Sequence, residues 1–467
     1  MKSRELQNLG IPKGEKIQLA VQLSRDARDL GMKKAAIRKT IKAIIEDPAS
    51  YMEDPFWKEL AASLGGAYAL ANPFVPREEP APWRQWGDDL EETAIQQMKN
   101  ACDLPVSVAG ALMPDAHLGY GLPIGGVLGT ENAVIPYAVG VDIACRMKMT
   151  VLDMPVSALT RHTNTLIRAL EQETRFGIGA DFKQQYRRDH EVLEQDWRVS
   201  PVTQRLKDKA WKQLGTSGSG NHFVEYGVFT LDQDDMGLEA GEYLAIMSHS
   251  GSRGTGAAVA SHYSRLAMSM HPELPKQLRH LAWLDMDTEA GQEYWAAMNL
   301  MGDYAAANHA CIHDAMLKSL KASALLQLEN HHNFCWLETH DGRELYVHRK
   351  GATPASEGEV GIIPGSMASP AFIVRGKGEP SSLRSAAHGA GRVMSRKQAK
   401  SQFSWKQVER ELESKGVTLL SAGLDEVPGV YKDIHKVMAD QSDLVETVAR
   451  FDPKLVKMAP PGERPED

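Results

Sequence analysis

The stretch Ser385-Ala-Ala-His-Gly-Ala-Gly-Arg-Val-Met-Ser-Arg396 places one histidine, His388, among small residues, with Arg392 and Arg396 after it. Small residues let a backbone approach a ligand closely, and guanidinium groups bind phosphate oxygens well. A histidine beside a phosphate can act as a nucleophile as well as a base. An isolated motif of this kind more often begins a helix with a structural histidine, so its meaning depends on the rest of the chain.

The composition is that of a soluble globular protein, since 42% of the 467 residues are hydrophobic and 24% are charged. A net charge of −8 argues against a general attraction to nucleic acid, but it allows a local basic groove. The four cysteines have no spacing typical of disulfides or zinc fingers. The chain also lacks an apolar signal core and an apolar run of about 18 residues. We therefore expect a cytoplasmic protein with no membrane association.

The N-terminal region differs in charge from the rest of the chain. Residues 1–60 hold 12 Lys/Arg and 9 Asp/Glu, and apolar residues at helical spacing from Gly14 to Glu46 are interrupted at Gly31. This pattern predicts two short helices with a basic surface, which is either a solvated face or a contact for RNA or another subunit. The Pro-rich passage from Asn72 to Trp83 predicts a linker. We divide the chain into an extension with its linker (1–75), a main domain (76–460) and a flexible tail (461–467).

The main domain alternates between segments with a strand-and-loop pattern and segments with a helical pattern. Short β-branched runs between Gly and Pro predict strands and loops at residues 100–150, 214–256 and 326–380. Residues 155–215 and 258–325 are helical by pattern, and a further helix is expected after the His388 stretch, through about Ser414. Together these segments predict an α+β fold.

Five separate loops carry side chains that bind metals or phosphate, most of them beside glycine or serine. They contain Asp115 and His117; Asp142 and Cys145; Asn221, His222 and Glu225; His249 and Arg253; and His331, His332 and Asn333. Any one of these histidines alone is more often structural, but glycine neighbours offer no surface for a histidine to pack against. The five loops together therefore favour a functional site.

The candidate ligands are more numerous than one metal ion needs. One Asp, one Cys and three His exceed the four ligands of a tetrahedral zinc, whereas two metals bridged by the thiolate would use all five. Mixed oxygen, nitrogen and sulfur ligands suit Mn²⁺, Zn²⁺ or Co²⁺, and the residues do not choose among them. Paired metals recur in phosphoryl transfer because they neutralise the oxygens that gain charge.

Nucleotide binding has weaker signals. The turn Pro364-Gly-Ser366 after a strand can cradle an anion or the edge of a purine, and Tyr431 and Lys457 are candidates for contacts with a base. A P-loop, a Rossmann glycine fingerprint and the Lys-x-Asp-Gly motif of ordinary nucleic-acid ligases are absent from the sequence. If a nucleotide is carried covalently, His388 is the candidate carrier.

These motifs, in order from about residue 100 to Lys457, resemble the RtcB family of GTP-dependent RNA ligases. The shared segments are Met-Pro-Asp-x-His-x-Gly-x-Gly, Gly-Val-Asp-Ile-x-Cys, Gly-Asn-His-Phe, His-Ser-Gly-Ser-Arg-Gly, His-His-Asn, Ile-Ile-Pro-Gly-Ser-Met and His-Gly-Ala-Gly-Arg. Ala386, Ala387, Ala144 and Ala368 stand where the family pattern has other residues. The resemblance therefore points to a divergent branch of the family with an N-terminal extension.

The resemblance implies mixed β-sheets flanked by helices around a central cleft that holds two metals. It also implies an enzyme that joins RNA 3′-phosphate or 2′,3′-cyclic phosphate ends to 5′-hydroxyl ends, in RNA repair or tRNA splicing. GTP would guanylylate His388, the GMP would move to the RNA 3′-phosphate, and the 5′-hydroxyl would displace it. An archease-like protein is a possible activator by the same resemblance.

The resemblance also assigns roles to residues. The ligands of two Mn²⁺ would be Asp142, Cys145, His222, His249 and His332, with Cys145 bridging. The GTP pocket would contain Asn221, Glu225, His332, Asn333, Pro364, Gly365, Ser366, Met367, Ala390, Gly391, Tyr431 and Lys457. RNA or phosphate would contact Asp115, Arg253, Lys350 and Arg392. The alternatives are a binuclear phosphoesterase that acts on RNA ends without joining them, and a non-catalytic RNA-binding protein.

Overall fold

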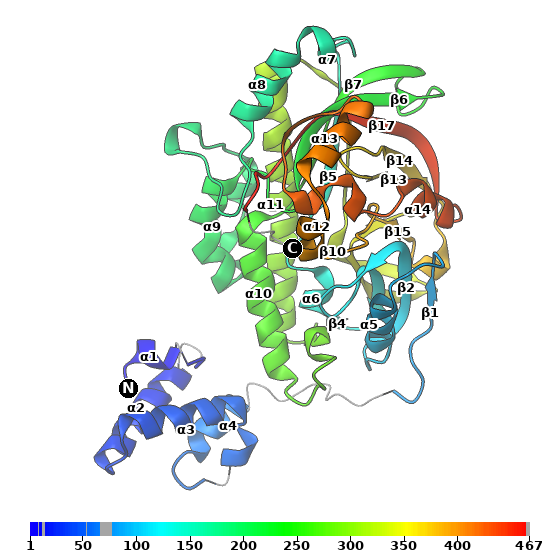
Figure 1. Cartoon of the computed structure of the whole chain (residues 1–467). Coiled ribbons are helices and arrows are strands. Elements are labelled where there is room, and N and C mark those ends of the chain that lie inside the picture. Colours follow the sequence, from blue (N-terminus) through cyan, green and yellow to red (C-terminus); the bar gives the residue numbers. More distant parts are fainter. Residues whose placement is uncertain (8, 12–14, 53, 66–76, 464–467) are drawn as a thin grey trace. The chain divides into compact units, whose positions relative to one another are not determined.

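The computed structural model describes residues 1–7, 9–11, 15–52, 54–65 and 77–463, with the elements labelled in Figure 1. The chain divides into two compact units, Met1–Pro73 with Ser269–Pro272, and Phe74–Met268 with Glu273–Asp467. Residues 72–76 of the expected linker and the last four residues of the expected flexible tail lie outside the described residues. None of the described helices has the length and apolar character needed to cross a bilayer.

The small unit contains α1 (Ser3–Gln7), α2 (Glu15–Asp29), α3 (Lys34–Glu46) and α4 (Lys58–Gly65). The two helices expected between Gly14 and Glu46 are α2 and α3, and Gly31 adopts a positive φ of 88° in the turn between them. Apolar side chains from all four helices form a separate core that includes Leu6, Ile41 and Leu60. Leu30 lies in this turn, after the last residue of α2, and is 73% exposed.

The larger sheet follows the order β13-β14-β17-β6-β7-β5-β9, and β16 pairs with β17. Its strands are β5 (Arg146–Leu152), β6 (Phe223–Leu231), β7 (Gly241–Ser250), β9 (Ala324–His331), β13 (Val360–Ile363), β14 (Ala371–Gly376), β16 (Thr418–Ser421) and β17 (Val445–Met458). All of these pairs are antiparallel except β16 with β17.

This sheet buries both of its faces, because side chains alternate along each strand. Ala245 and Met247 of β7 belong to a core within the strands, whereas Leu244 and Ile246 pack with Ile312 of the long helix α11 (Glu289–Leu320). The two edge strands approach each other, since Asn330 of β9 hydrogen-bonds the N–H and the C=O of Ile362 in β13, at 2.9 and 3.3 Å. The sheet therefore curls around its inner core.

The second sheet has the order β1-β2-β3-β11-β10. Its strands are β1 (Trp83–Gln85), β2 (Ser107–His117), β3 (Ile124–Thr130), β10 (Asn333–His340) and β11 (Arg343–Lys350). Two small pairs complete the strands, β4 (Ala133–Val134) with β8 (Leu284–Asp285), and β12 (Ala352–Pro354) with β15 (Ser385–Ala387). The parallel pairing of β1 with β2 makes this sheet mixed.

The remaining helices of the large unit are α5 (Glu92–Cys102), α6 (Pro136–Val139), α7 (Ala158–Arg161), α8 (Thr163–Glu173), α9 (Pro201–Gln213), α10 (Arg253–Met270), α12 (Arg396–Gln402), α13 (Trp405–Ser414) and α14 (Ile434–Asp440). Helices flank mixed sheets, which confirms the α+β prediction (Figure 1). Two helical predictions were too broad. Residues 174–200 form loops and 3₁₀ turns around the positive-φ residues Gly177 and Gly179, and residues 271–288, between α10 and α11, form turns, a 3₁₀ turn and β8. The helix expected after the His388 stretch is present as α12 and α13.

Candidate active site

Strand register brings four of the distant loops together. Arg146 at the start of β5 pairs with Ser250 at the end of β7 and with His331 at the end of β9. Phe223 at the start of β6 pairs with His249 of β7. The loop residues next to these strand ends therefore meet at one end of the sheet. These loop residues include Asp142, Cys145, His222 and His332.

The donor atoms of these side chains form two overlapping groups that share Cys145. In one group, the Cys145 Sγ lies 3.1 Å from the His249 Nε2, which lies 3.1 Å from the His332 Nε2. In the other, the same Sγ lies 3.4 Å from the His222 Nε2, which lies 3.2 Å from the Asp142 Oδ2. A shared thiolate between two sets of three ligands fits a two-metal centre.

The hydrogen bonds around the histidines also fit metal binding. The Nδ1 of His249 lies 3.0 Å from the carbonyl oxygen of Asn221, so this nitrogen donates its hydrogen and the Nε2 keeps its lone pair. Burial, followed by the charge of His222, lowers the pKa of His249 to about 3. Burial likewise lowers the pKa of His332 well below its usual range. Both rings are therefore neutral, as metal ligation requires.

The carboxylate of Asp142 is oriented by its neighbours. Its Oδ1 accepts hydrogen bonds from the backbone N–H of Ser252 at 3.1 Å and from the Ser252 hydroxyl at 3.4 Å. The backbone passes so close at Gly251 that a Cβ there would lie 2.1 Å from the Asp142 Oδ2. Ala144, between Asp142 and Cys145, adopts a positive φ of 57°. That conformation favours glycine, so alanine at this position departs from the residue that the backbone suits best.

Asp115 orients His388. One oxygen of its fully buried carboxylate lies 2.7 Å from the His388 Nδ1 and accepts the backbone N–H groups of His388 and Gly389 at 3.1 and 3.2 Å. The Nδ1 therefore donates its hydrogen, and the Nε2 keeps the lone pair that a nucleophile needs. Asp115 was expected to contact RNA phosphate, and this placement corrects that expectation, because a buried carboxylate orients an imidazole and repels a phosphate.

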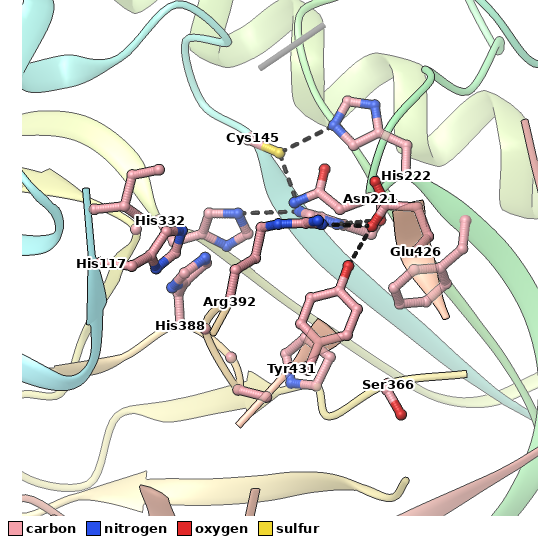
Figure 2. Close-up of a pocket in the computed structure, with 18 of the residues that line it drawn as sticks. His117, Cys145, Asn221, His222, His332, Ser366, His388, Arg392, Glu426 and Tyr431 are labelled. Carbon is pink, nitrogen blue, oxygen red and sulfur yellow. Dashed lines mark hydrogen bonds and ion pairs between the residues drawn. The ribbon is translucent and has the colours of Figure 1, made fainter. Parts of the chain in front are cut away.

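His388 lies beside the metal-ligand candidates. Its ring centroid is 4.9 Å from that of His332, and Figure 2 shows the two rings next to each other in the pocket. The turn after His388 needs glycine at position 391, where φ is 71° and a Cβ would lie 2.0 Å from the carbonyl oxygen of Asp115. The glycine-rich motif thus brings its backbone against the strand that supplies Asp115.

A cavity of about 670 Å³ joins the metal-ligand candidates to His388. Most of the expected site residues line it, namely Asp142, Cys145, Asn221, His222, Glu225, His249, His332, Asn333, Lys350, Pro364, Gly365, Ser366, Met367, His388, Ala390, Gly391, Arg392 and Tyr431. Asp115 is absent from the lining because it lies beneath His388. Arg253 and Lys457 are also absent from it.

The placement of Lys457 and Arg253 corrects two expectations. Lys457 of β17 donates to the carbonyl oxygen of Leu170 at 3.1 Å, whereas its neighbours Val456 and Met458 line the cavity. Because side chains alternate along a strand, Lys457 points to the other face. Arg253 is 1% exposed and donates to the Thr216 hydroxyl at 3.1 Å, so it supports a glycine-rich loop from beneath.

The two arginines after His388 contact an acidic residue that the sequence did not reveal. The guanidinium of Arg392 lies 3.3 Å from the Glu426 carboxylate and donates to the carbonyl oxygen of Asp425 at 2.9 Å. Arg396 and the hydroxyl of Tyr431 also bind Glu426. Figure 2 shows Arg392, Glu426 and Tyr431 converging in the pocket. A phosphate bound by Arg392 must therefore compete with Glu426.

Two amide side chains hold the site loops in place. Asn333 accepts the N–H of Gly351 at 2.8 Å, and its own carbonyl accepts the N–H of Ala144 at 2.6 Å, so it connects the metal-ligand loop to β11. Asn308 of α11 accepts the N–H of Gly215 at 2.7 Å and donates to the carbonyl oxygen of Thr216 at 2.9 Å. The helical pattern around Asn308 carried no signal for this role, because its partners are about 90 residues away.

Glu225 lies at the apolar part of the cavity, which Phe223, Met247, Val456 and Met458 also line. Its carboxylate has no hydrogen-bond partner within the described parts of the chain. Burial raises the pKa of Glu225 well above its usual range. A buried acceptor without a partner next to apolar side chains suits a flat ligand that offers N–H donors at its edge.

Comparison with known proteins agrees with these features. Residues 97–458 match the family model described as tRNA-splicing ligase RtcB. The RNA-splicing ligase RtcB1 of Escherichia coli strain ATCC 25922 is 37% identical over 402 residues, which cover 79% of this chain and 95% of that protein. The tRNA-splicing ligase RtcB of Thermococcus kodakarensis is 29% identical over 453 residues, which cover 80% of this chain and 93% of that protein.

Proposed function

Because this chain belongs to the RtcB family, we propose that it is an RNA ligase that joins 3′-phosphate or 2′,3′-cyclic phosphate ends to 5′-hydroxyl ends and consumes GTP. The observation that carries the proposal is the geometry of His388. Its Nδ1 is held 2.7 Å from the Asp115 carboxylate, and its ring lies beside the cluster of metal-ligand candidates. An oriented imidazole at a phosphate site is suited to nucleophilic attack.

We propose three transfers. The His388 Nε2 attacks the α-phosphorus of GTP, an N–P bond forms and pyrophosphate leaves. An oxygen of the RNA 3′-phosphate then attacks the same phosphorus, and the imidazole leaves as the GMP moves to RNA. Finally the 5′-hydroxyl oxygen attacks the RNA phosphorus, loses its proton and expels GMP. A cyclic end must first be opened by water to the 3′-phosphate.

The metal-ligand candidates support a requirement for Mn²⁺. One ion would be held by Asp142, Cys145 and His222, and the other by Cys145, His249 and His332. Such ions neutralise phosphate oxygens that carry or gain negative charge. The protein's own part is to orient the His249 imidazole and the Asp142 carboxylate, through the hydrogen bonds of Asn221 and Ser252, while burial keeps His249 and His332 neutral.

Glu225 supports guanine as the base. Guanine offers two donor groups on one edge, N1–H and the exocyclic N2–H₂. An ionised carboxylate can accept from both, and these hydrogen bonds would stabilise the charged form of Glu225 that burial alone disfavours. Adenine has no hydrogen at N1 to donate, so the same carboxylate would lose that hydrogen bond. The apolar residues beside Glu225 would cover the base, while Ser366 and Tyr431 lie in the same cavity.

A joining assay tests the function. A labelled RNA with a 3′-phosphate and a second RNA with a 5′-hydroxyl are incubated with the protein, GTP and Mn²⁺. We expect a joined product that depends on both GTP and Mn²⁺, and no product when the 3′ end is a hydroxyl. Removal of the end phosphate without joining, at every GTP concentration, would instead establish the phosphoesterase alternative.

We further propose that the small N-terminal unit binds the RNA backbone. Arg38 and Lys39 lie on the exposed side of α3, opposite the buried Ile37 and Ile41. Near the α-amino group of Met1, the charges of Arg28, Lys34 and Arg25 add to burial in lowering its pKa, while the charge of Glu5 opposes them. Cations thus gather on this unit although the whole chain has a net charge of −8. Phosphate contacts are a role that such a surface can serve.

Charge reversal tests this proposal. We expect Lys39→Glu to weaken the binding of single-stranded RNA regardless of its sequence. The slope of log affinity against log salt concentration should also become shallower by about one unit, because about one fewer counterion is released on binding. Lys58→Glu on α4 makes the same charge change on another helix and is the matched control. Filter binding at several salt concentrations measures both. Equal affinities for the two variants would remove the RNA-binding role of α3 without affecting the ligase proposal.

A further inference from the structure

The loop of residues 118–121 exposes two large apolar side chains at the cavity that contains His388. Leu118 is 55% exposed and Tyr120 is 64% exposed, and both line the cavity. Scattered exposed apolar residues are ordinary on protein surfaces, but two in one loop at a ligand cavity are a sign of binding.

The loop is held rigidly by side chains from outside it. Glu91 accepts the N–H of Leu118 at 3.0 Å, and Gln97 accepts the N–H of Gly119 at 3.0 Å and donates to its carbonyl oxygen at 2.6 Å. Lys350 donates to the carbonyl oxygen of Tyr120 at 2.5 Å. Tyr120 is therefore presented to solvent on a backbone that is already ordered. A preorganised aromatic residue loses little conformational entropy when it binds a ligand.

Tyr120 belongs to a cluster of three rings from separate parts of the chain. Its centroid lies 5.7 Å from that of His280 and 6.5 Å from that of Tyr137, and the centroids of Tyr137 and His280 are 4.9 Å apart. The loop also rests on the backbone of His280, because a Cβ at Gly121 would lie 2.7 Å from the His280 carbonyl oxygen. These contacts support the ring of Tyr120 from behind while leaving it mostly exposed.

The cluster lies close to the proposed nucleophile. Lys350, which binds the Tyr120 carbonyl, is followed by Gly351, where a Cβ would lie 3.1 Å from the His388 Cε1. Lys350 lines the cavity, and burial lowers its pKa to about 7, so a bound phosphate would favour its charged form. Arg279 also lies near His280, since its charge adds to burial in lowering the pKa of His280. The platform thus combines exposed aromatic rings with nearby cations at the rim of a phosphate site. A single-stranded nucleic acid has the matching chemistry, flat bases on an anionic backbone.

We propose that Tyr120, supported by Tyr137 and His280, stacks on a base of the RNA end that enters the cavity. The inference rests on the proposed function, because it takes the RNA end to be the substrate of His388. Stacking needs only the face of a base, so the platform orders the RNA end without choosing its sequence. Tyr120 is in this view a positioning residue for the RNA, with no part in the transfer of GMP to the protein.

Tyr120→Ala tests the platform in the full chain. The probe is a short single-stranded RNA with a 3′-phosphate and 2-aminopurine as its last base, whose fluorescence is quenched by stacking. We expect the variant to bind this RNA about 5- to 150-fold more weakly and to lose the quenching, whereas Tyr120→Phe should retain both. Tyr186→Ala is the matched control, since Tyr186 is 59% exposed and lies outside this cavity.

Two further measurements make each outcome decisive. An RNA that lacks the last base should bind the wild type as weakly as the complete RNA binds Tyr120→Ala, with no further loss in the variant. Formation of the protein–GMP adduct, which needs no RNA, should be unchanged in Tyr120→Ala. Unaltered binding and quenching in the variant would overturn the platform, and so would a loss of adduct, which would show that Tyr120 supports the site itself. Failure of the wild type to join RNA would count against the ligase, while the binding comparison would still decide the platform.

Discussion

His388→Ala is expected to abolish transfer of GMP to the protein and to reduce RNA joining by more than about 10³-fold, since alanine offers no atom that can replace the nucleophilic nitrogen. Label from the α-phosphate of GTP should remain on the denatured wild-type protein and be absent from the variant. The adduct should be labile in acid and stable in alkali, as expected of a phosphoramidate. RNA binding should persist, because the variant removes only the imidazole from a cavity with many other polar groups.

The control for this variant is His162→Ala, which removes an exposed imidazole outside the cavity and should form the adduct at the wild-type rate. Asp115→Asn is an informative companion, because it keeps His388 and removes the charge that holds its Nδ1–H. We expect adduct formation to slow but not to vanish in this companion variant. A labelled adduct that survives in His388→Ala would show that another residue carries the nucleotide and would end the assignment of the nucleophile.

Cys145→Ala is expected to lower bound Mn²⁺ from two ions to fewer than one per chain and to reduce joining by more than about 10²-fold. The reason is that Cys145 is the only residue shared by the two ligand groups found among the described parts of the site. Removing an unshared ligand would weaken the binding of one ion, whereas removing the shared ligand weakens the binding of both ions. Metal content after dialysis against Mn²⁺-containing buffer measures this effect directly, without reference to activity.

Cys311→Ala is the matched control for the metal measurement. Its thiol is buried in α11, burial raises its pKa to about 11, and it does not line the cavity. A thiol of this kind stays protonated and is a poor metal ligand. We expect the control to retain its metal and to fold with about the stability of the wild type. Two bound ions in Cys145→Ala would show that the thiolate does not bridge the metals. The two ions would then be held by the other ligands without Cys145.

The sequence by itself determined which metal-binding and phosphate-binding side chains are available to the site, and it determined the α+β class. Hydrophobic alternation and helical spacing are local properties, so the strands at residues 214–256 and the helices on either side of Gly31 were readable from pattern alone. The motif around His388 was also readable, because glycines beside a histidine indicate a close backbone approach. These predictions depend on residues that lie within about one turn or one strand of each other.

Tertiary structure alone decided which of these side chains meet. Cys145, His222, His249 and His332 converge because β5, β6, β7 and β9 are neighbours in one sheet with a particular register, and pairing across such distances leaves no local signal. Asp115 lies under His388 although 273 residues separate them. Lys457 was misplaced because an offset of one residue along a strand turns a side chain to the opposite face. Glu426 and the loop that presents Tyr120 were missed because their roles depend on partners brought to them by the fold.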